Sequence, residues 1–325
     1  MGNSPPCRNQ AQSTRIAGTA KAVINNEEYP VVPNGASGRN RKAIRVAVAT
    51  TGGDAPGMNA CIRAIVKAAR GYAEVIGVRD GGLGLARNRS NPPDYIELDS
   101  GSVNSIVDRA GTILGTARRD EIAETLGIDF HSPSFFRECA RLTVAALDDH
   151  EIDGVIFLGG DGASHASLSH FKANQGKRPF VVVPASIDND VANTATTLGF
   201  DSAVTEAMQA VDKIRETATA LRRVFVVEVM GNDHGEIAAH VALASGAEAV
   251  LVPERGEYTH EEIDKLARNL AEVGMRPEHS AIVIVAEASH LPSLLGEPER
   301  QERRIGVGMT AYHLELLLRD SWKRQ

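Results

Sequence analysis

Apolar and polar residues follow two periodicities along the chain. Short apolar runs rich in β-branched residues predict buried strands, and longer segments with apolar residues three or four positions apart predict helices between them. The predicted strands cover 44–50, 73–78, 154–158, 181–183, 224–229, 249–252 and 281–285. The predicted helices cover about 60–70, 133–150, 202–221, 261–273 and 308–322. This alternation predicts an α/β fold whose mainly parallel sheets carry helices on both faces.

Two carboxylates follow one of these strands. The apolar run Val181–Val183 ends at Pro184, and Asp188 and Asp190 come shortly after it. In an open α/β sheet, ligands bind at the carboxyl ends of the strands, so acids just past a buried strand lie where substrates arrive. Alternatively, the acids and Asn189 only form a turn, since Asp and Asn bond their own backbone. From this stretch alone, both interpretations stay open.

A glycine-rich turn follows the first predicted strand. Gly52 and Gly53 stand between that strand and a predicted helix, which is the layout of a phosphate cradle. The turn lacks the G-K-[ST] ending of a P-loop and the G-x-G-x-x-G of a dinucleotide site. A structural glycine turn is the alternative.

Two other loops carry charges suited to a phosphorylated ligand. Asp161 lies between Gly160 and Gly162 after the strand 154–158, and a carboxylate in such a loop can hold Mg²⁺ through water. Arg118 and Arg119 follow a Gly/Thr-rich segment and are suited to bidentate phosphate contacts, although surface arginine pairs are common.

Composition narrows the classes of function. The chain has 325 residues and a formal net charge of -7, so no overall positive charge attracts nucleic acid or an anionic membrane. No apolar run approaches the roughly 20 residues of a membrane span. The three cysteines lie far apart, which favours reduced thiols in a cytoplasmic protein. The histidines are scattered, and a surface or packing role is expected for each, His234 included.

The first 42 residues are polar and without amphipathic period. Such a composition is typical of a disordered extension, although the apolar patch 29–33 could dock on the folded part as a strand.

Several blocks in register resemble the 6-phosphofructokinase family. They are Gly-Gly-Asp-Ala-Pro-Gly-Met-Asn at 52–59, Gly-Gly-Asp-Gly at 159–162, Ser-Ile-Asp-Asn-Asp at 186–190 and Val-Val-Glu-Val-Met-Gly at 226–231. The resemblance runs from about 44 to about 287. It implies two Rossmann-like lobes with the active site in the cleft between them.

The resemblance also implies a division of the chain. After the extension 1–42, it implies a nucleotide-binding lobe at 43–199 and a sugar-binding lobe at 200–304. The last segment, 305–325, is then a helix that packs back on the first lobe.

The resemblance implies roles for individual residues. Asp188 matches the base that takes the proton of the attacking hydroxyl, with Asp190 supporting the same loop. Asp161 matches the Mg²⁺-associated aspartate, and Gly52 and Arg118 match the catalytic groups that hold the transferring phosphoryl group. The remaining matches are Gly53, Gly160 and Gly162 for ATP, and Ser186, Arg223, Met230, Gly231 and Glu287 for the sugar substrate.

The chain also departs from the family pattern. The His-Ile-Gln-Arg-Gly-Gly block, which grips the sugar phosphate, is absent between Glu287 and the last predicted helix. Met-Gly-Arg reads Met-Gly-Asn at 230–232, and the adenine-stacking aromatic is replaced near Gly81 and Gly82. Arg303 or Arg304 could restore part of the phosphate grip.

The resemblance implies an ATP- and Mg²⁺-dependent kinase that phosphorylates fructose 6-phosphate or a related sugar and forms a homo-oligomer. The alternatives are a kinase for a free sugar, nucleoside or cyclitol, and a non-catalytic regulatory homologue that binds nucleotide. A nicotinamide-dependent dehydrogenase fits the fold pattern but lacks the glycine fingerprint.

Overall fold

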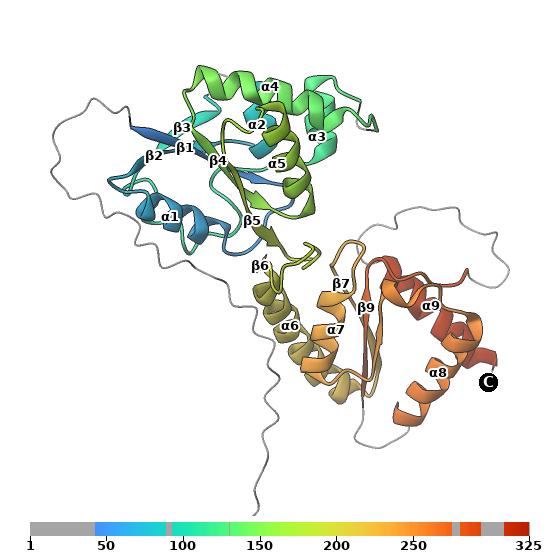
Figure 1. The fold of residues 1–325 in the computed structure, drawn as a ribbon. Coiled ribbons are helices and arrows are strands. Elements are labelled where there is room, and N and C mark those ends of the chain that lie inside the picture. The colour runs from blue at the N-terminus through green and yellow to red at the C-terminus, as the bar shows by residue number, and fades with distance from the viewer. Residues whose placement is uncertain (1–42, 89–92, 130, 275–279, 294–308, 325) are drawn as a thin grey trace, which may run out of the picture. The chain divides into compact units, whose positions relative to one another are not determined.

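The computed structural model describes residues 43–88, 93–129, 131–274, 280–293 and 309–324 (Figure 1). The expected N-terminal extension 1–42, and Arg303 and Arg304, lie outside the described residues. In the described part of the chain, no helix combines the length and the apolar character needed to cross a membrane.

The first sheet has the strand order β3-β2-β1-β4-β5-β6. Its strands are parallel except for the pair of β2 and β3. Thr51 pairs with Gly159, and Gly159 pairs with Pro184, so β1, β4 and β5 end side by side. The strands are β1 (Ile44–Thr51), β2 (Ala73–Val78), β3 (Tyr95–Leu98), β4 (Gly154–Gly159), β5 (Phe180–Ser186) and β6 (Leu198–Gly199).

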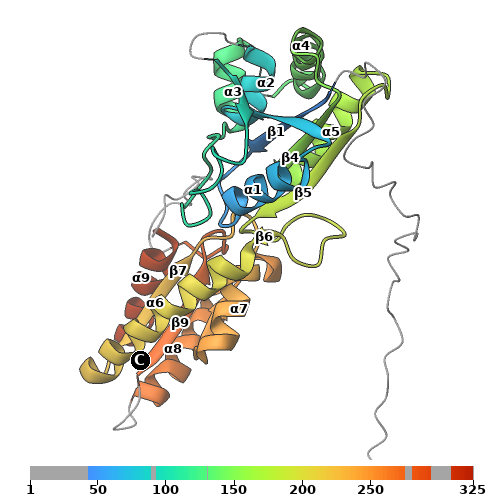
Figure 2. The ribbon, with the colours of Figure 1, turned by 90° about the vertical axis from the view of Figure 1, so that its left-hand side faces the viewer.

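Helices cover both faces of this sheet because its buried residues alternate. Val48 points to a core shared with α1, whereas Ala47 and Ala49 point to a core shared with α2, α4 and α5. Figure 2 shows α1 apart from the other helices of this sheet. The helices are α1 (Met58–Ala68), α2 (Gly81–Arg87), α3 (Arg119–Leu126), α4 (Phe135–Asp149) and α5 (Asp161–Ala173).

The second sheet is smaller and fully parallel, with the order β7-β9-β8. Every residue of β9 is buried, since Ile282 and Ile284 face α6 and α7 while Val283 and Val285 face α8 and α9 (Figure 1). Its elements are α6 (Phe200–Leu221), β7 (Val224–Val229), α7 (Glu236–Ser245), β8 (Ala249–Leu251), a 3-10 turn (Pro253–Arg255), α8 (His260–Gly274), β9 (Ala281–Ala286) and α9 (Met309–Arg324).

The predicted α/β fold with mainly parallel sheets is confirmed, and one packing prediction is wrong. The last helix, α9, does not pack back on the first lobe. Its Leu314, Leu317 and Leu318 are buried in a core with Leu251 and Ile263 of the second sheet. An amphipathic helix packs where its apolar side meets an uncovered apolar face, and the face of β9 beside α8 provides one.

Candidate active site

The loops after three adjacent parallel strands meet at one edge of the first sheet. Gly52 follows β1, Gly160 follows β4, and Ser186 ends β5. A Cβ atom added to Gly160 would lie 3.5 Å from the Ser186 Cβ and 3.8 Å from Asp190 Oδ1. The structure therefore brings together the glycine and acidic loops that the sequence places far apart.

The loop after β5 is fixed by its neutral side chains. Thr197 donates from its backbone N–H to Asn189 Oδ1 (2.9 Å) and from its hydroxyl to the Ser186 carbonyl oxygen (2.6 Å). Ser186 Oγ in turn accepts from the backbone N–H of Asp188 (3.1 Å). Asn189, with φ 55°, has the left-handed backbone that asparagine tolerates. The hydrogen bonds that form the turn in this stretch thus come from Asn189, Ser186 and Thr197, and not from the two aspartate carboxylates.

The two carboxylates beside Asn189 are held in partly buried positions. Asp190 Oδ1 is buried and has no hydrogen-bond partner among the described residues. Ile187, directly before Asp188, packs against a core of the first sheet and a core of the second. A half-buried carboxylate without a compensating cation costs folding free energy, which favours a chemical role over a structural one.

Asp188 has an electrostatic environment that suits a base. Burial raises the pKa of its carboxyl, and the negative charges of Asp190 and Glu287 raise it further. The nearby His234 and a hydrogen bond from Ser186 oppose this shift. A carboxylate whose pKa is raised binds a proton more readily than an ordinary aspartate, and a general base needs this property.

Glu287 follows β9 and orders the loop after β7. Its Oε1 accepts from the backbone N–H groups of Gly231 (3.0 Å) and Asn232 (2.8 Å). Gly231 is required here, because a Cβ at this position would lie 2.4 Å from the His234 carbonyl oxygen. Met230 is 53% exposed beside this ordered backbone. The predicted sugar-contacting residues Met230, Gly231 and Glu287 therefore form one local structure.

The glycine turn after β1 has an open backbone. Gly52 has φ 90°, and its carbonyl oxygen accepts from Thr116 Oγ1 (2.7 Å), which ties this turn to the loop that carries Arg118. A Cβ at Gly53 would meet nothing within 4 Å. Arg118 is exposed and immediately precedes α3. This arrangement leaves backbone amides and a guanidinium available for an anionic group.

Asp161 and Gly162 are the first residues of α5 and not part of a loop as the sequence suggested. Gly162 is exposed with nothing within 4 Å of an added Cβ, and the Asp161 carboxylate is exposed and 3.2 Å from His165 Nδ1. Among the described residues, no group of three metal-ligating side chains gathers. A single open carboxylate fits Mg²⁺, which keeps several waters and takes further oxygens from phosphates. The partial positive charge of the helix N-terminus favours phosphate at the same place.

Arg223 is separated from the other predicted site residues. It precedes β7, whereas Met230 follows β7 and Glu287 follows the parallel neighbour β9. At about 3.3 Å per residue, the six-residue strand puts roughly 20 Å between Arg223 and the Glu287 end. Arg223 is exposed there and does not join the site of its own chain.

His234 is the residue near Asp188 that sequence reasoning assigned a surface or packing role. The imidazole lies close enough to act on the Asp188 carboxyl. Its one sequence signal is its place in the short loop after Met230 and Gly231, which also belong to the site.

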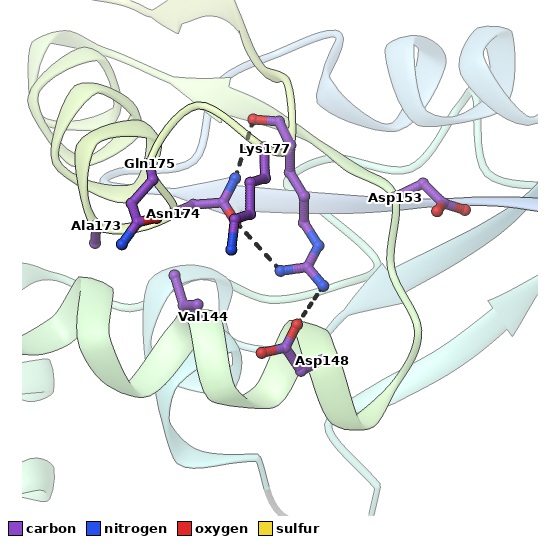
Figure 3. A pocket seen from close by; sticks show the side chains of 8 residues that line it. Val144, Asp148, Asp153, Ala173, Asn174, Gln175 and Lys177 are labelled. Atoms are coloured by element: carbon purple, nitrogen blue, oxygen red, sulfur yellow. Dashed lines mark hydrogen bonds and ion pairs between the residues drawn. The ribbon is translucent and has the colours of Figure 1, made fainter.

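A cavity of about 420 Å³ lies at the other end of the first sheet, before β4 and β5 begin (Figure 3). Arg178 in its wall donates to the Ile152 carbonyl oxygen (2.7 Å) and pairs with Asp148. These contacts tie α4 to the start of β5. The cavity is therefore remote from Asp188, and its charged groups serve the fold.

Comparisons with known proteins find relatives of this chain. A family model described as Phosphofructokinase matches residues 45–315. The ATP-dependent 6-phosphofructokinase of Streptococcus sanguinis (strain SK36) is 41% identical over 241 residues, which cover 74% of this chain and 65% of that protein. The protein of the same name from Streptococcus pneumoniae (strain CGSP14) is 41% identical over 213 residues, covering 65% of this chain and 58% of that protein. The chain thus spans about three fifths of the length of these curated relatives.

Solved structures share the fold. Phosphofructokinase from Pichia pastoris in the T-state matches with a TM-score of 0.68 and 26% identity, covering 88% of this chain and 29% of that chain. Phosphofructokinase from Saccharomyces cerevisiae matches with a TM-score of 0.68 and 27% identity, covering 86% of this chain and 36% of that chain.

Proposed function

Because the chain belongs to the phosphofructokinase family, we propose that it is an ATP- and Mg²⁺-dependent kinase acting on a hydroxyl of fructose 6-phosphate or a related sugar. The observation that carries this proposal is the position and environment of Asp188. Its carboxyl is half-buried and has a raised pKa, which suits a base. It follows β5 at the sheet edge where β1 and β4 also end and their glycine turns begin. The same-family relatives named ATP-dependent 6-phosphofructokinase support the donor and the acceptor class.

The proposed chemistry divides between two groups of residues. On the acceptor side, the sugar hydroxyl oxygen attacks the γ-phosphorus of ATP while Asp188 takes its proton, and the bond to the ADP oxygen breaks. Glu287 and the backbone at Met230 and Gly231 orient the sugar. Phosphoryl transfer depends mainly on such positioning and on charge neutralisation.

On the donor side, the partly exposed Gly52, the exposed Gly53, the Arg118 guanidinium and the N-terminus of α5 would bind the phosphates. Asp161 would hold Mg²⁺, which would supply positive charge that neutralises the phosphates. Gly160 and Gly162 leave room for the nucleotide, since small residues let its phosphates approach the backbone.

A second acceptor class is favoured by two observations. The family's His-Ile-Gln-Arg-Gly-Gly block is missing from the sequence, and Arg223 lies at the far end of β7. We therefore keep a free sugar, nucleoside or cyclitol as the alternative acceptor. A non-catalytic regulatory homologue is less consistent with the chain, because such a protein has no physical need for Asp188, Asp161 and Arg118 together.

A cytoplasmic homo-oligomer is part of the same proposal. Exposed apolar side chains such as Leu243, which is 83% exposed on α7, are consistent with a subunit interface. The mass of the purified protein in solution, measured by light scattering, checks this point.

The deciding experiment measures ADP release with ATP and Mg²⁺ against fructose 6-phosphate, fructose, inosine and myo-inositol. We expect turnover with at least one of these acceptors and its loss on chelation of Mg²⁺. Binding of ATP without turnover on any acceptor would support the regulatory alternative.

A further inference from the structure

The short strand β6 is fixed between the end of β5 and the turn that leads from β1 into α1. On one side, its two residues pair with the last two residues of β5. On the other side, a Cβ added to Gly199 would lie 2.9 Å from the Ala55 Cβ, and one added to Gly57 would lie 2.9 Å from Leu198 Cδ1. Packing this close leaves β6 little room to shift. Thr197, directly before β6, therefore has a fixed backbone position.

The polar groups of Thr197 bond the loop that carries Asp188. Thr197 is 2% exposed. Its hydroxyl donates to the Ser186 carbonyl oxygen (2.6 Å), and its backbone N–H donates to Asn189 Oδ1 (2.9 Å). The hydroxyl also lies 3.3 Å from Asn189 Oδ1, but it has one proton, which the nearer Ser186 oxygen accepts. Asp188 stands in the chain between the two residues that Thr197 bonds.

These bonds fix the backbone on both sides of Asp188. A trans peptide is planar, so the bond that holds the Ser186 carbonyl oxygen also fixes the plane of the peptide that follows Ser186. The backbone N–H of Asp188 donates to Ser186 Oγ (3.1 Å), and Asn189 has the left-handed φ of 55°. The direction of the Asp188 side chain follows from this arrangement, because the backbone sets where Cβ points.

We propose that Thr197 is a positioning residue that holds the Asp188 carboxylate where it can take the proton of the acceptor hydroxyl. This inference rests on the proposed function, in which Asp188 is the base. Because Thr197 is buried, it acts through the Ser186 backbone and the Asn189 side chain. A displacement of about 1 Å in a reacting group can cost about a hundredfold in rate, so loss of the Thr197 hydroxyl should affect kcat more than ATP binding.

Two substitutions at Thr197 test the role of the hydroxyl. Thr197→Val keeps nearly the same shape and lacks the donor, whereas Thr197→Ser keeps the donor. The probe is whichever of fructose 6-phosphate, fructose, inosine and myo-inositol gives the highest turnover. We expect Thr197→Val to lower kcat about 10–100-fold with the KM for ATP within about twofold. Thr197→Ser should stay within about threefold of the unsubstituted chain.

The matched control is another threonine whose hydroxyl bonds a backbone carbonyl. Thr205 Oγ1 donates to the Asp201 carbonyl oxygen (2.8 Å) within α6. Thr205→Val removes that bond without touching the loop of Asp188, and its kcat should not change.

A second variant breaks the other bond and does not depend on the folding of Thr197→Val. Asn189→Gly removes the Oδ1 acceptor, and glycine adopts a φ of 55° without strain. We expect the same pattern of lower kcat with an unchanged KM for ATP. All kinetics are measured well below the thermal midpoint of each variant, found by calorimetry, so that unfolded protein does not lower the measured kcat.

The Asp188→Asn background separates a positioning role from a structural one. Once the base is gone its position no longer matters, so Thr197→Val should change the remaining kcat by less than about threefold. A fall there as large as in the unsubstituted background would mean that Thr197 acts on something other than Asp188, and it overturns the proposal.

The outcomes also separate this inference from the proposed function. An unchanged kcat in a folded Thr197→Val or Asn189→Gly variant overturns the role of Thr197 and leaves the kinase proposal standing. An equal loss in Thr197→Val and Thr197→Ser does the same, because the hydroxyl is then not the group that matters. If the unsubstituted chain phosphorylates no acceptor, both proposals fall.

Discussion

At the scale of single residues, the site depends on the Asp188 carboxylate, whose ionised form the fold destabilises. Burial and two neighbouring acids raise the pKa of this carboxyl. The native state then binds a proton on Asp188 more tightly than the unfolded chain does. This contribution favours folding at low pH and turns unfavourable as pH rises through the folded pKa.

The substitution Asp188→Asn tests both the role of Asp188 as a base and its effect on stability. We expect kcat to fall by roughly 10²–10⁴-fold with ATP binding nearly unchanged, because the base is lost and the shape is kept. At neutral pH the thermal midpoint should stay the same or rise, since the variant no longer carries the buried charge. Asp212→Asn, at an exposed position on α6, is the control and should alter neither quantity. A less stable variant with near-normal kcat would show that Asp188 is structural.

The choice of phosphoryl donor is also a property of single residues. The resemblance to the family implies ATP as the donor, because the pyrophosphate-using branch has an aspartate at the position of Gly162 and a lysine at that of Ala185. Ala185 is buried in the core, so the structural argument rests on Gly162, which is exposed with nothing within 4 Å of an added Cβ. We expect ATP to be used at least about a hundredfold better than pyrophosphate, because an added carboxylate would repel the inner phosphate. Equal turnover with the two donors in parallel assays contradicts this.

At the scale of elements, the packing of α2 onto the end of β1 requires glycine. Gly81 has φ 52°, and a Cβ there would lie 1.9 Å from the Thr50 carbonyl oxygen. We expect Gly81→Ala to cost at least about 2 kcal/mol of stability and to lower the thermal midpoint by roughly 4–8 °C. Gly82→Ala is the matched control, since its Cβ would meet the end of the Ile122 side chain at 3.3 Å and the Thr51 hydroxyl at 3.8 Å, and no backbone atom within 4 Å. Equal midpoints for the two variants, measured by calorimetry, would contradict this account.

The same helix shows why the sequence predicted some elements and not others. Strands such as β9 are continuous apolar runs and were predicted nearly to the residue, but Gly-Gly-Leu-Gly in α2 has the composition of a turn. Tertiary packing against Thr50 overrides that local preference. The helix α7 was missed because it is apolar on several sides and gives little amphipathic signal. The strand β3 was missed because it is short and pairs antiparallel at the sheet edge.

The candidate site was predictable to a similar extent. Asp188, Asp161 and the glycine turns stand directly after strands, so their places follow from the chain order. The position of Arg223 needed the direction of β7, and the unpartnered Nδ1 of His234 depends on three-dimensional packing. Neither leaves a periodic signal in the sequence.

At the scale of the whole chain, residues 43–325 form a compact unit by themselves. We expect removal of residues 1–42 to leave the thermal midpoint within about 2 °C, because that segment has too little apolar content to contribute to a core. Calorimetry on the shortened and full chains checks this. A larger drop, or dissociation of an oligomer seen by light scattering, would mean that the apolar patch 29–33 docks on the folded part.

At the same scale, the missing block should change how tightly the chain binds the phosphate group of fructose 6-phosphate. A sugar phosphate leaves water only if its charges meet charge-assisted hydrogen bonds, each contributing roughly 1.5–3 kcal/mol. The absent His-Ile-Gln-Arg-Gly-Gly block removes two such donors, and Arg223 lies at the far end of β7, where its own chain's site cannot use it. Fructose 6-phosphate should therefore bind roughly 10²–10⁴-fold more weakly than a chain with both donors would bind it.

The measurement compares steady-state kinetics with fructose 6-phosphate and with fructose. We expect a KM in the millimolar range for the phosphorylated sugar and little preference over the free one. Glu287 supports either acceptor, since a carboxylate accepts from hydroxyls with or without a phosphate nearby. A micromolar KM with clear preference for the phosphorylated sugar would show that other cations restore the grip. Arg303→Ala and Arg304→Ala would then show whether these arginines are the cations that bind the phosphate. Arg319 pairs with Glu315 on α9, so Arg319→Ala serves as the control.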